Sequence, residues 1–373
     1  MIIGVLKEIK PNEYRVAATP AAVGEIVARG HKVLVQKDAG LGSGFANEEY
    51  AAAGATILDT AEEVYTQADL FYKVKEMFPE EWKYMNKEKI VFTYIHSNAH
   101  PEETDAILES KVTAIAYEDI TDANGGFPLL KPMSILAGKG GFLAALHFSQ
   151  SVHGGRGLLL NRIPGVPTPE ITILGCGASG LGVAELAAAF GNKVTILDVS
   201  WKAMEAAKNL LPPNVEFMYS DRQNLETCLK RTDVLFNCIL WDKNRKDHIV
   251  YREDLKMMKP GSLIVDVACD DNGAIESCRS TSHTDPIYTE EGIIHYAVDN
   301  IPSGFSCTAS QTLSAATLPH ALAIAEKGVE QALLDDKHLR RGLTTYKGKL
   351  CLMETALKHN LPFTDPKDAI EGK

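Results

Sequence analysis

The sequence has no cluster of basic residues and no long, purely apolar run. The uncharged stretch 301–325 contains two prolines and many Ser and Thr residues, which makes it a poor candidate for a membrane-spanning helix. The net charge of −11 argues against nucleic acid and against an anionic membrane surface as partners. With 45% apolar and 23% charged residues, the composition is that of an ordinary soluble globular protein.

Cysteine pairs of the Cys-x-x-Cys type are also missing, although seven cysteines are present. The first residues, MIIGVLKE, have no basic segment before an apolar run, so we expect no secretory signal. A cytoplasmic protein with free thiols is the simplest interpretation. His96 and His100 have a spacing that suits a metal only on a helix, and they follow a predicted strand, so we expect no metal site.

Short β-rich runs alternate with helical patterns over the first third of the chain. Thr19 as N-cap and Pro20 at the first position predict a helix over 19–31. This alternation is typical of a parallel, doubly wound sheet. The strands predicted here are 2–6, 32–36, 55–58, 70–74, 90–95 and 112–118.

A second α/β series follows a predicted helix over 134–152 and the proline-rich connection 161–170. From residue 308 onward the pattern is helical. We therefore predict two doubly wound parallel-sheet (Rossmann-like) domains, with residues 131–304 inserted between 1–130 and 305–373. The strands predicted in the inserted domain are 171–174, 193–197, 215–219, 233–240, 262–268 and 293–298.

The segment ITILGCGASGLGVAELAAAFGNKVTILD (171–198) has the pattern of a dinucleotide site. Gly175 permits a tight turn, Gly177 lets a pyrophosphate approach the backbone, and Gly180 lets the helix pack closely on the strand. The helix N-terminus favours phosphate. Asp198 ends the next strand, where a carboxylate binds ribose hydroxyls and repels the 2′-phosphate of NADP. The pattern predicts bound NAD, although Lys202 nearby offers a cation for a phosphate.

Polar residues follow several predicted strands at the edge where ligands bind in such sheets. Lys75 and His96 follow two strands of the first domain, and Arg15 follows its first strand. Cations there would hold a carboxylate and a histidine would move protons near neutral pH, which suits chemistry on an amino or keto acid. We interpret Lys73 as a charge at the strand edge and Glu76 as a partner of Lys75.

The sequence resembles the alanine dehydrogenases, within a wider family that includes the transhydrogenase alpha subunit and saccharopine-type enzymes. The resemblance runs nearly end to end. The motifs that carry it are MIIGVLKEIKPNEYRVAATPAAV (1–23), AGLGSGFANEEYAAAGA (39–55), PMSILAGKGG (132–141), MKPGSLIVDVACD (258–270), GIIHYAVDNIP (292–302) and GLTTYKGKL (342–350).

The resemblance implies a role for each matching residue. Arg15 and Lys75 would bind the substrate, His96 would be the general acid/base, and Asp270 would position water or ammonia. Met133 and Asn300 would line the substrate pocket. The substrate domain would be 1–130 with 305–373, and the NAD domain 131–304. The residues implied to hold NAD are Gly175, Gly177, Ala178, Ser179, Gly180, Asp198, Ser220 and Ser134.

The resemblance further implies a homo-oligomer, as a rule a hexamer, that interconverts L-alanine with pyruvate and ammonia. Two alternatives stay open. The charged loop 241–255 resembles that of carboxyethyl-ornithine synthase, which joins pyruvate reductively to an amino acid. The other alternative is a regulatory protein that binds NAD(H) without turnover.

Overall fold

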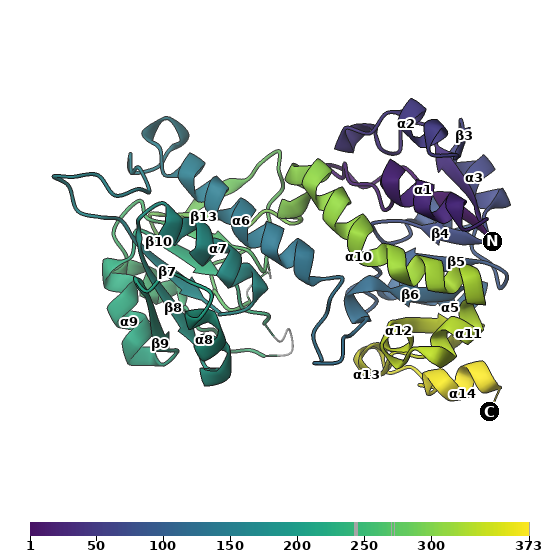
Figure 1. The fold of residues 1–373 in the computed structure, drawn as a ribbon. Helices are drawn as coiled ribbons and strands as arrows, with labels where there is room; N and C mark the ends of the chain where they lie inside the picture. Colours follow the sequence, from purple (N-terminus) through teal and green to yellow (C-terminus); the bar gives the residue numbers. More distant parts are fainter. Residues whose placement is uncertain (242–244, 270, 272, 373) are drawn as a thin grey trace. The chain divides into compact units, whose positions relative to one another are not determined.

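The computed structural model describes residues 1–241, 245–269, 271 and 273–372 (Figure 1). The chain forms two compact units. We call Met1–Pro132 with Ser306–Lys373 the split unit, and Met133–Phe305 the inserted unit. Each unit has a sheet with helices on both faces, so the predicted fold class is confirmed. No helix in the described part of the chain is both long and apolar enough to cross a membrane.

The described sheet of the split unit has the strand order β15-β14-β6-β5-β4-β1-β2-β3. Strands β1 to β6 pair in parallel, whereas β14 pairs antiparallel with β6 and with β15. The strands are β1 (Ile2–Val5), β2 (Lys32–Gln36), β3 (Thr56–Leu58), β4 (Leu70–Tyr72), β5 (Ile90–Thr93), β6 (Thr113–Ala116), β14 (Leu343–Tyr346) and β15 (Lys349–Leu350).

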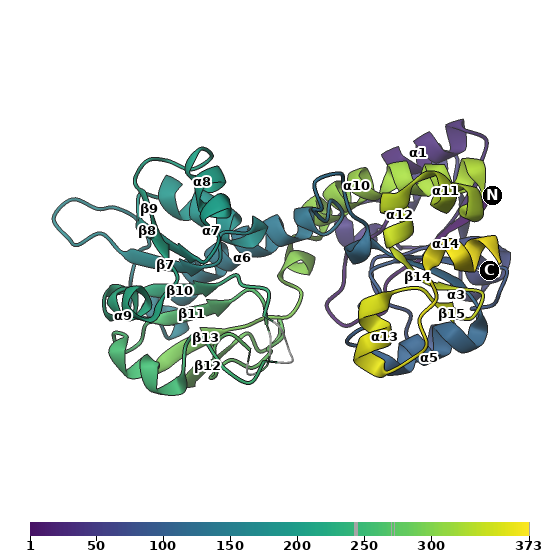
Figure 2. The same ribbon diagram turned by 90° about the horizontal axis from the view of Figure 1, so that it is seen from below.

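Helices cover both faces of this sheet; α1 and α10 lie on one side in Figure 2, and α5 on the other. The start of α1 confirms the prediction, because the Thr19 side chain accepts the Ala22 N–H and Pro20 is the first helical residue. The helices are α1 (Pro20–Ala28), α2 (Asn47–Ala52), α3 (Ala61–Gln67), α4 (Pro79–Trp82), α5 (Pro101–Ser110), α10 (Ser306–Lys327), α11 (Val329–Asp335), α12 (Lys337–Arg341), α13 (Met353–His359) and α14 (Pro366–Glu371).

The described sheet of the inserted unit has the order β12-β13-β11-β10-β7-β8-β9, parallel except for the edge strand β12. The order reverses beside β7, which is where doubly wound sheets bind their ligands. The strands are β7 (Glu170–Leu174), β8 (Lys193–Asp198), β9 (Val215–Tyr219), β10 (Val234–Asn237), β11 (Leu263–Asp266), β12 (Ile287–Glu290) and β13 (Ile293–Tyr296).

Alternate residues of these strands pack into two core clusters on opposite faces, as the period of two requires. Ile173 packs with residues of α6 and α7, whereas Leu174 packs with residues of α9. Because both faces are covered, the central strands are continuous apolar runs. The helices are α6 (Lys131–Phe148), α7 (Ala178–Ala189), α8 (Trp201–Lys208) and α9 (Arg222–Arg231).

One detail of the sequence prediction was wrong. The segment after residue 308 is not purely helical, because β14 and β15 extend the sheet of the split unit. Within the confirmed fold class, both sheets also contain antiparallel pairs, which β12, β14 and β15 form. Those short strands pair with partners that a local pattern does not reveal.

Candidate active site

Three of the predicted site residues follow the carboxyl ends of adjacent strands in the split unit. Arg15 lies in the loop after β1, Lys75 follows β4, and His96 follows β5. These strands are neighbours in the order β5-β4-β1. The sheet therefore brings two cations and an imidazole to one edge.

Arg15 is buried, with 4% of its surface exposed. Its Nε donates to Glu13 Oε1 at 2.7 Å, and Nη2 donates to the other carboxylate oxygen. Burial alone would lower the pKa of Arg15, but the Glu13 carboxylate raises it overall. The guanidinium is thus a fixed positive charge, oriented by a bidentate pair.

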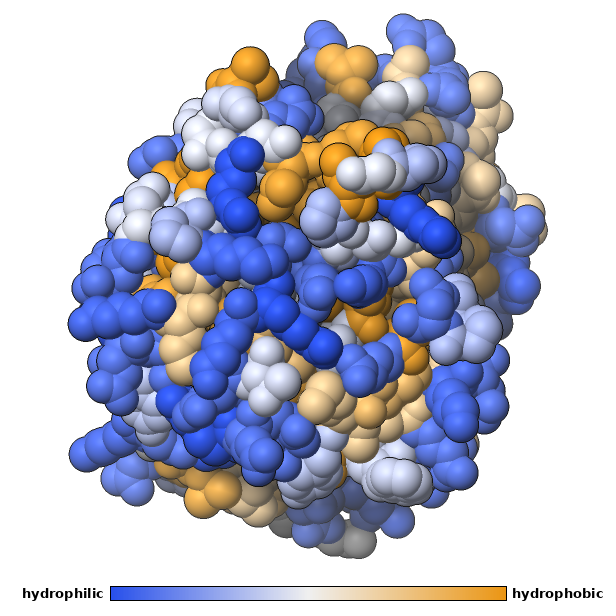
Figure 3. All heavy atoms as spheres, turned by 90° about the vertical axis from the view of Figure 1, so that its left-hand side faces the viewer, coloured by the Kyte–Doolittle hydropathy of each residue, from blue (hydrophilic) through white to orange (hydrophobic). Residues whose placement is uncertain are grey.

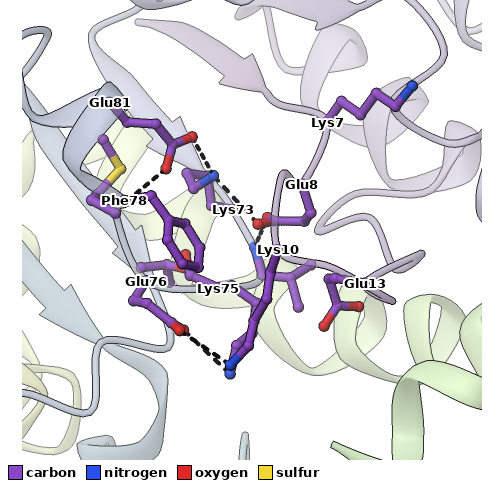
Figure 4. A network of polar contacts seen from close by, with 12 residues as sticks. Lys7, Glu8, Lys10, Glu13, Lys73, Lys75, Glu76, Phe78 and Glu81 are labelled. Atoms are coloured by element: carbon purple, nitrogen blue, oxygen red, sulfur yellow. Dashed lines mark hydrogen bonds and ion pairs between the residues drawn. The ribbon is translucent and has the colours of Figure 1, made fainter. Parts of the chain in front are cut away.

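Lys75 is 8% exposed, and its Nζ lies 3.2 Å from Glu76 Oε2. Glu76 also pairs with Lys10 at 3.3 Å, so one carboxylate pairs with two ammonium groups (Figure 4). Burial alone would raise the pKa of Glu76, but Lys75 and Lys10 lower it to about 2. Glu76 is therefore an anion throughout the neutral range, which confirms the interpretation that it pairs with Lys75.

His96 has a left-handed backbone with φ 53°, an uncommon conformation for a residue with a side chain. Glu118, after β6, supports it, because its carboxylate accepts the backbone N–H groups of Ile95 and His96. Glu118 Oε1 also lies 3.7 Å from His96 Nδ1. The imidazole stacks on Tyr94, at 5.9 Å between centroids and 3° between planes. Tyr94 in turn lies within electrostatic range of Arg15.

Glu118 was missed by the sequence prediction, although its position at the end of the predicted strand 112–118 was a usable signal. Burial raises the pKa of its carboxyl, and its bonds to backbone N–H groups oppose that rise. The charge of Lys75 also acts on Glu118. Glu118 thus links the lysine and the histidine electrostatically.

The interpretation of Lys73 as a charge at the strand edge was wrong. Lys73 is fully buried, and its Nζ lies 2.8 Å from Glu81 and 3.3 Å from Glu8 (Figure 4). Burial alone would lower the pKa of Lys73, but these carboxylates and Tyr65 raise it well above its usual value. Lys73 is therefore an internal ion-pair residue.

The glycine turn of the inserted unit joins β7 to α7. Gly175 has φ 96°, a region that side chains rarely adopt. A Cβ at Gly180 would lie 2.0 Å from the Gly175 carbonyl oxygen, so helix and strand approach closely there. Apart from the residues adjacent to it in the chain, no atom lies within 4 Å of the Cβ position of Gly177, which leaves open space at the helix N-terminus. Ala178 and Ser179 begin α7.

Asp198 lies at the end of β8, beside this turn. Its Oδ2 accepts the Cys176 N–H at 2.6 Å, and its Oδ1 accepts the Ser200 N–H at 2.7 Å. A carboxylate has about four lone-pair sites, so these two bonds leave capacity for ribose hydroxyls. Ser220 follows β9, and its N–H donates to the Asp198 carbonyl oxygen at 3.0 Å. The turn, the carboxylate and the open space fit a dinucleotide.

The remaining predicted residues lie elsewhere in the inserted unit. Met133 and Ser134 are in the first turn of α6, and Met133 is buried. Asn300 follows β13 with φ 67°. Asp270 lies outside the described residues. Among those that are described, no group of three His, Cys, Asp or Glu side chains has the arrangement of a metal site.

Close contact between α6 and α7 is a further feature that the sequence prediction missed. A Cβ at Gly138 would lie 2.0 Å from the Ser179 carbonyl oxygen, and one at Gly182 would lie 2.8 Å from that of Ile135. The glycines at these positions allow α6 to lie against the first turn of α7. This contact places the helix that carries Ser134 beside the glycine turn.

The charged loop after β10 is described from Arg245 onward. The Arg245 guanidinium forms a bidentate pair with Asp247, and it lies 4.2 Å from the ring centroid of Trp241. Asp247 is about half exposed. The arginine thus interacts within its own loop.

Comparisons with known proteins agree over the whole chain. The family model described as "Alanine dehydrogenase/PNT, N-terminal domain" matches residues 4–137, and "Alanine dehydrogenase/PNT, C-terminal domain" matches residues 142–352. An alanine dehydrogenase of Methanococcus maripaludis is 42% identical over 99% of this chain and 100% of its own length. That of Bacillus subtilis is 41% identical over 100% of this chain and 98% of its own.

Solved structures give the same result. An L-alanine dehydrogenase matches with a TM-score of 0.92 and 36% identity, over 96% of this chain and 99% of that one. A transhydrogenase from Sinorhizobium meliloti, 22% identical with a TM-score of 0.80 over 95% of this chain and 99% of its own, shares the fold. The resemblance predicted from the motifs is confirmed: the chain belongs to the alanine dehydrogenase/PNT family.

Proposed function

We propose that the protein catalyses the reversible, NAD-dependent oxidative deamination of L-alanine to pyruvate and ammonium. The observation that carries this proposal is the cluster of Arg15, Lys75 and His96 at one sheet edge, in a chain related end to end to alanine dehydrogenases. The chain is an amino-acid dehydrogenase, and its substrates are small molecules.

Arg15 and Lys75 bind the substrate. The buried guanidinium of Arg15 holds the carboxylate of alanine or pyruvate, a pairing that its fork geometry favours. Lys75 donates to the carbonyl oxygen, where negative charge develops in the transition state. Glu76 and Lys10 support this role because they keep the Lys75 side chain in an ion-pair network.

His96 moves the proton. It takes protons from the substrate amine and water during deamination and returns them in the reverse direction. Glu118 orients it and stabilises the imidazolium form, since its carboxylate lies 3.7 Å from Nδ1. His96 is thus a base oriented by a neighbouring carboxylate, as in other acid/base catalysts.

The inserted unit binds NAD, which supplies the hydride acceptor for the substrate Cα. Gly175, Gly177 and Gly180 with Ala178 and Ser179 form the turn at the pyrophosphate, and the N-terminus of α7 favours its charge. Asp198 accepts the ribose hydroxyls, and it disfavours NADP by charge repulsion. Ser220 and Ser134 complete the cofactor contacts.

The family resemblance assigns roles toward the substrate to three further residues. Met133 and Asn300 line the substrate pocket. Asp270 positions water for attack on the imine carbon in deamination, and ammonia for attack on the carbonyl carbon in the reverse direction. These roles follow from the family resemblance, and each is tested by replacement of that residue.

One assay separates this function from its alternatives. The purified protein is given NADH and pyruvate with ammonium, or with ornithine or lysine in its place, and the product mass is measured. We expect alanine with ammonium and no turnover with the amino acids. A secondary amine that contains both carbon skeletons would reject the alanine assignment, and the absence of turnover with every amine would favour a regulator.

We further infer that the protein is a cytoplasmic homo-oligomer, with six copies as the family expectation. Segment 154–169, between α6 and β7, extends away from the sheet (Figures 1 and 2) and exposes the apolar residues Leu159, Ile163 and Val166. The face in Figure 3 is largely hydrophilic, with apolar side chains gathered in its upper part. Exposed apolar residues favour an interface between copies.

Light scattering tests the oligomer. We expect the wild type to have several times the mass of one chain, and replacement of those three residues with Ser to lower it. A monomeric wild type would reject the proposal. Cell fractionation tests the location.

A further inference from the structure

The chain segment that carries Lys75 follows β4 and extends past the point where β4 stops pairing with β1. That pairing ends at Val5 and Tyr72, because the chain after β1 turns into a loop. The Val74 N–H therefore has a side-chain acceptor instead of a strand partner. Glu8 Oε1 accepts it at 2.6 Å and so replaces the carbonyl oxygen of a neighbouring strand (Figure 4).

Two further side chains hold the same segment. The Tyr117 hydroxyl donates to the Lys73 carbonyl oxygen at 2.9 Å, and the Thr93 hydroxyl donates to the Lys75 carbonyl oxygen at 2.8 Å. With Glu8, they fix the main chain of three successive residues. Glu8 is the member of this set that accepts a backbone N–H and also pairs with a buried cation.

The second carboxylate oxygen of Glu8 is held by an ion pair. This oxygen, Oε2, lies 3.3 Å from Lys73 Nζ, which lies 2.8 Å from Glu81 Oε1. Glu81 also accepts the Tyr65 hydroxyl and, through Oε2, the Phe78 N–H at 2.9 Å. Because each of the two carboxylates has partners for both oxygens, Glu8 has little freedom to move.

We propose that Glu8 is a positioning residue for Lys75: through Val74, it fixes the direction in which the Lys75 ammonium meets the substrate oxygen. This inference rests on the proposed role of Lys75. Glu8 is 7% exposed and its two oxygens are occupied by the Val74 N–H and by Lys73, so we expect it to act through the lysine. Displacement of a catalytic group by about 1 Å can cost a factor of about 10² in rate.

Three substitutions of Glu8 separate its possible contributions. Glu8→Met has similar length and no acceptor, and Glu8→Asp keeps the charge but is too short to reach the Val74 N–H. Glu8→Gln keeps an acceptor of the same reach. We expect kcat with pyruvate and ammonium to fall about 10- to 100-fold in the first two and less than about 5-fold in Glu8→Gln.

Tyr50→Phe is the matched control, because it removes another buried bond of the split unit, from the Tyr50 hydroxyl to the Ala18 carbonyl oxygen at 2.8 Å. It should lower the melting temperature without changing kcat. The dissociation constant of NADH should stay within about twofold in all variants, since the glycine turn belongs to the inserted unit. Wild-type kcat in Glu8→Asp, or equal losses in Glu8→Gln and Glu8→Met, would overturn the proposal.

A double-mutant cycle tests whether Glu8 acts through Lys75. In a Lys75→Met background, Glu8→Asp should change the residual kcat/KM less than about twofold, because there is no ammonium left to position. Multiplicative losses would overturn the positioning role. Near-normal turnover of Lys75→Met would instead reject the function proposed for Lys75. If Lys75→Met is nearly inactive but Glu8→Asp turns over normally, only the role of Glu8 is rejected.

Discussion

Replacing Lys73 with Met removes the cation from a fully buried pair of carboxylates. Lys73 Nζ lies 2.8 Å from Glu81 and 3.3 Å from Glu8, and all three side chains are at most 7% exposed. The methionine fills similar space, so the change removes charge with little change in packing volume. The two carboxylates then lie in the core without a counter-charge.

The expected loss of stability is about 3–5 kcal/mol, the usual cost of removing one partner from a buried ion pair. For a unit of this size, about 2–4 °C per kcal/mol gives a fall in melting temperature of roughly 6–20 °C. Lys37→Met is the control, because Lys37 pairs with Asp59 at 3.3 Å with both side chains more than half exposed. It should cost at most about 1 kcal/mol.

The deficit of Lys73→Met should also grow with pH. Burial already raises the pKa of Glu8, and Lys73 opposes that rise, so loss of the lysine raises the pKa further. At pH values between the pKa of Glu8 in the unfolded state and its higher pKa in the folded state, the folded protein binds one proton more than the unfolded protein. The free energy of unfolding therefore falls as pH rises through this range. The deficit relative to wild type should be smaller at pH 5 than at pH 8.

Urea unfolding followed by tryptophan fluorescence measures this effect in the correct unit. Trp82 lies in the split unit, whereas Trp201 and Trp241 lie in the inserted unit, so a Trp201→Phe, Trp241→Phe background reports on Trp82 alone. A deficit no larger than that of Lys37→Met, or one that does not change between the two pH values, would refute the buried-charge argument.

Three further predictions concern catalysis. Asp198→Gly should reduce the preference for NAD over NADP, compared as kcat/KM, and a wild type without preference would reject the role of Asp198. His96→Asn, which tolerates the left-handed backbone, should lower kcat by on the order of 10²–10⁴ with NADH binding unchanged; normal turnover would make His96 structural. Arg245→Ala with Lys246→Ala should leave alanine turnover within a few-fold, and a larger loss would place that loop in the active site.

The sequence predicted the parts of the site whose signals are local. The glycine turn, its helix and Asp198 lie within one short segment, and each has its own backbone or charge requirement. Lys75 and His96 were predicted because parallel strands end at one edge, which requires no knowledge of strand order.

Partners that are distant in the chain could not be predicted in this way. Glu8 and Lys73 are 65 residues apart, and nothing near Lys73 in sequence shows that a carboxylate from another strand end would meet it. Similarly, β14 has four residues and β15 two, so their pairing depends on the edge that β6 offers. The identity of such contacts is set by topology, not by local pattern.

The late position of β14 in the chain has a consequence for synthesis. Its Thr345 is paired with Ala114, and its hydroxyl bonds to Val112, 233 residues earlier. The entire inserted unit therefore leaves the ribosome before β6 obtains β14, its second neighbour in the sheet. Until then the β6 edge is unpaired, and such edges recruit other chains. A protein truncated before residue 343 should keep its nucleotide-binding unit folded and yet aggregate through the exposed edge of the other sheet.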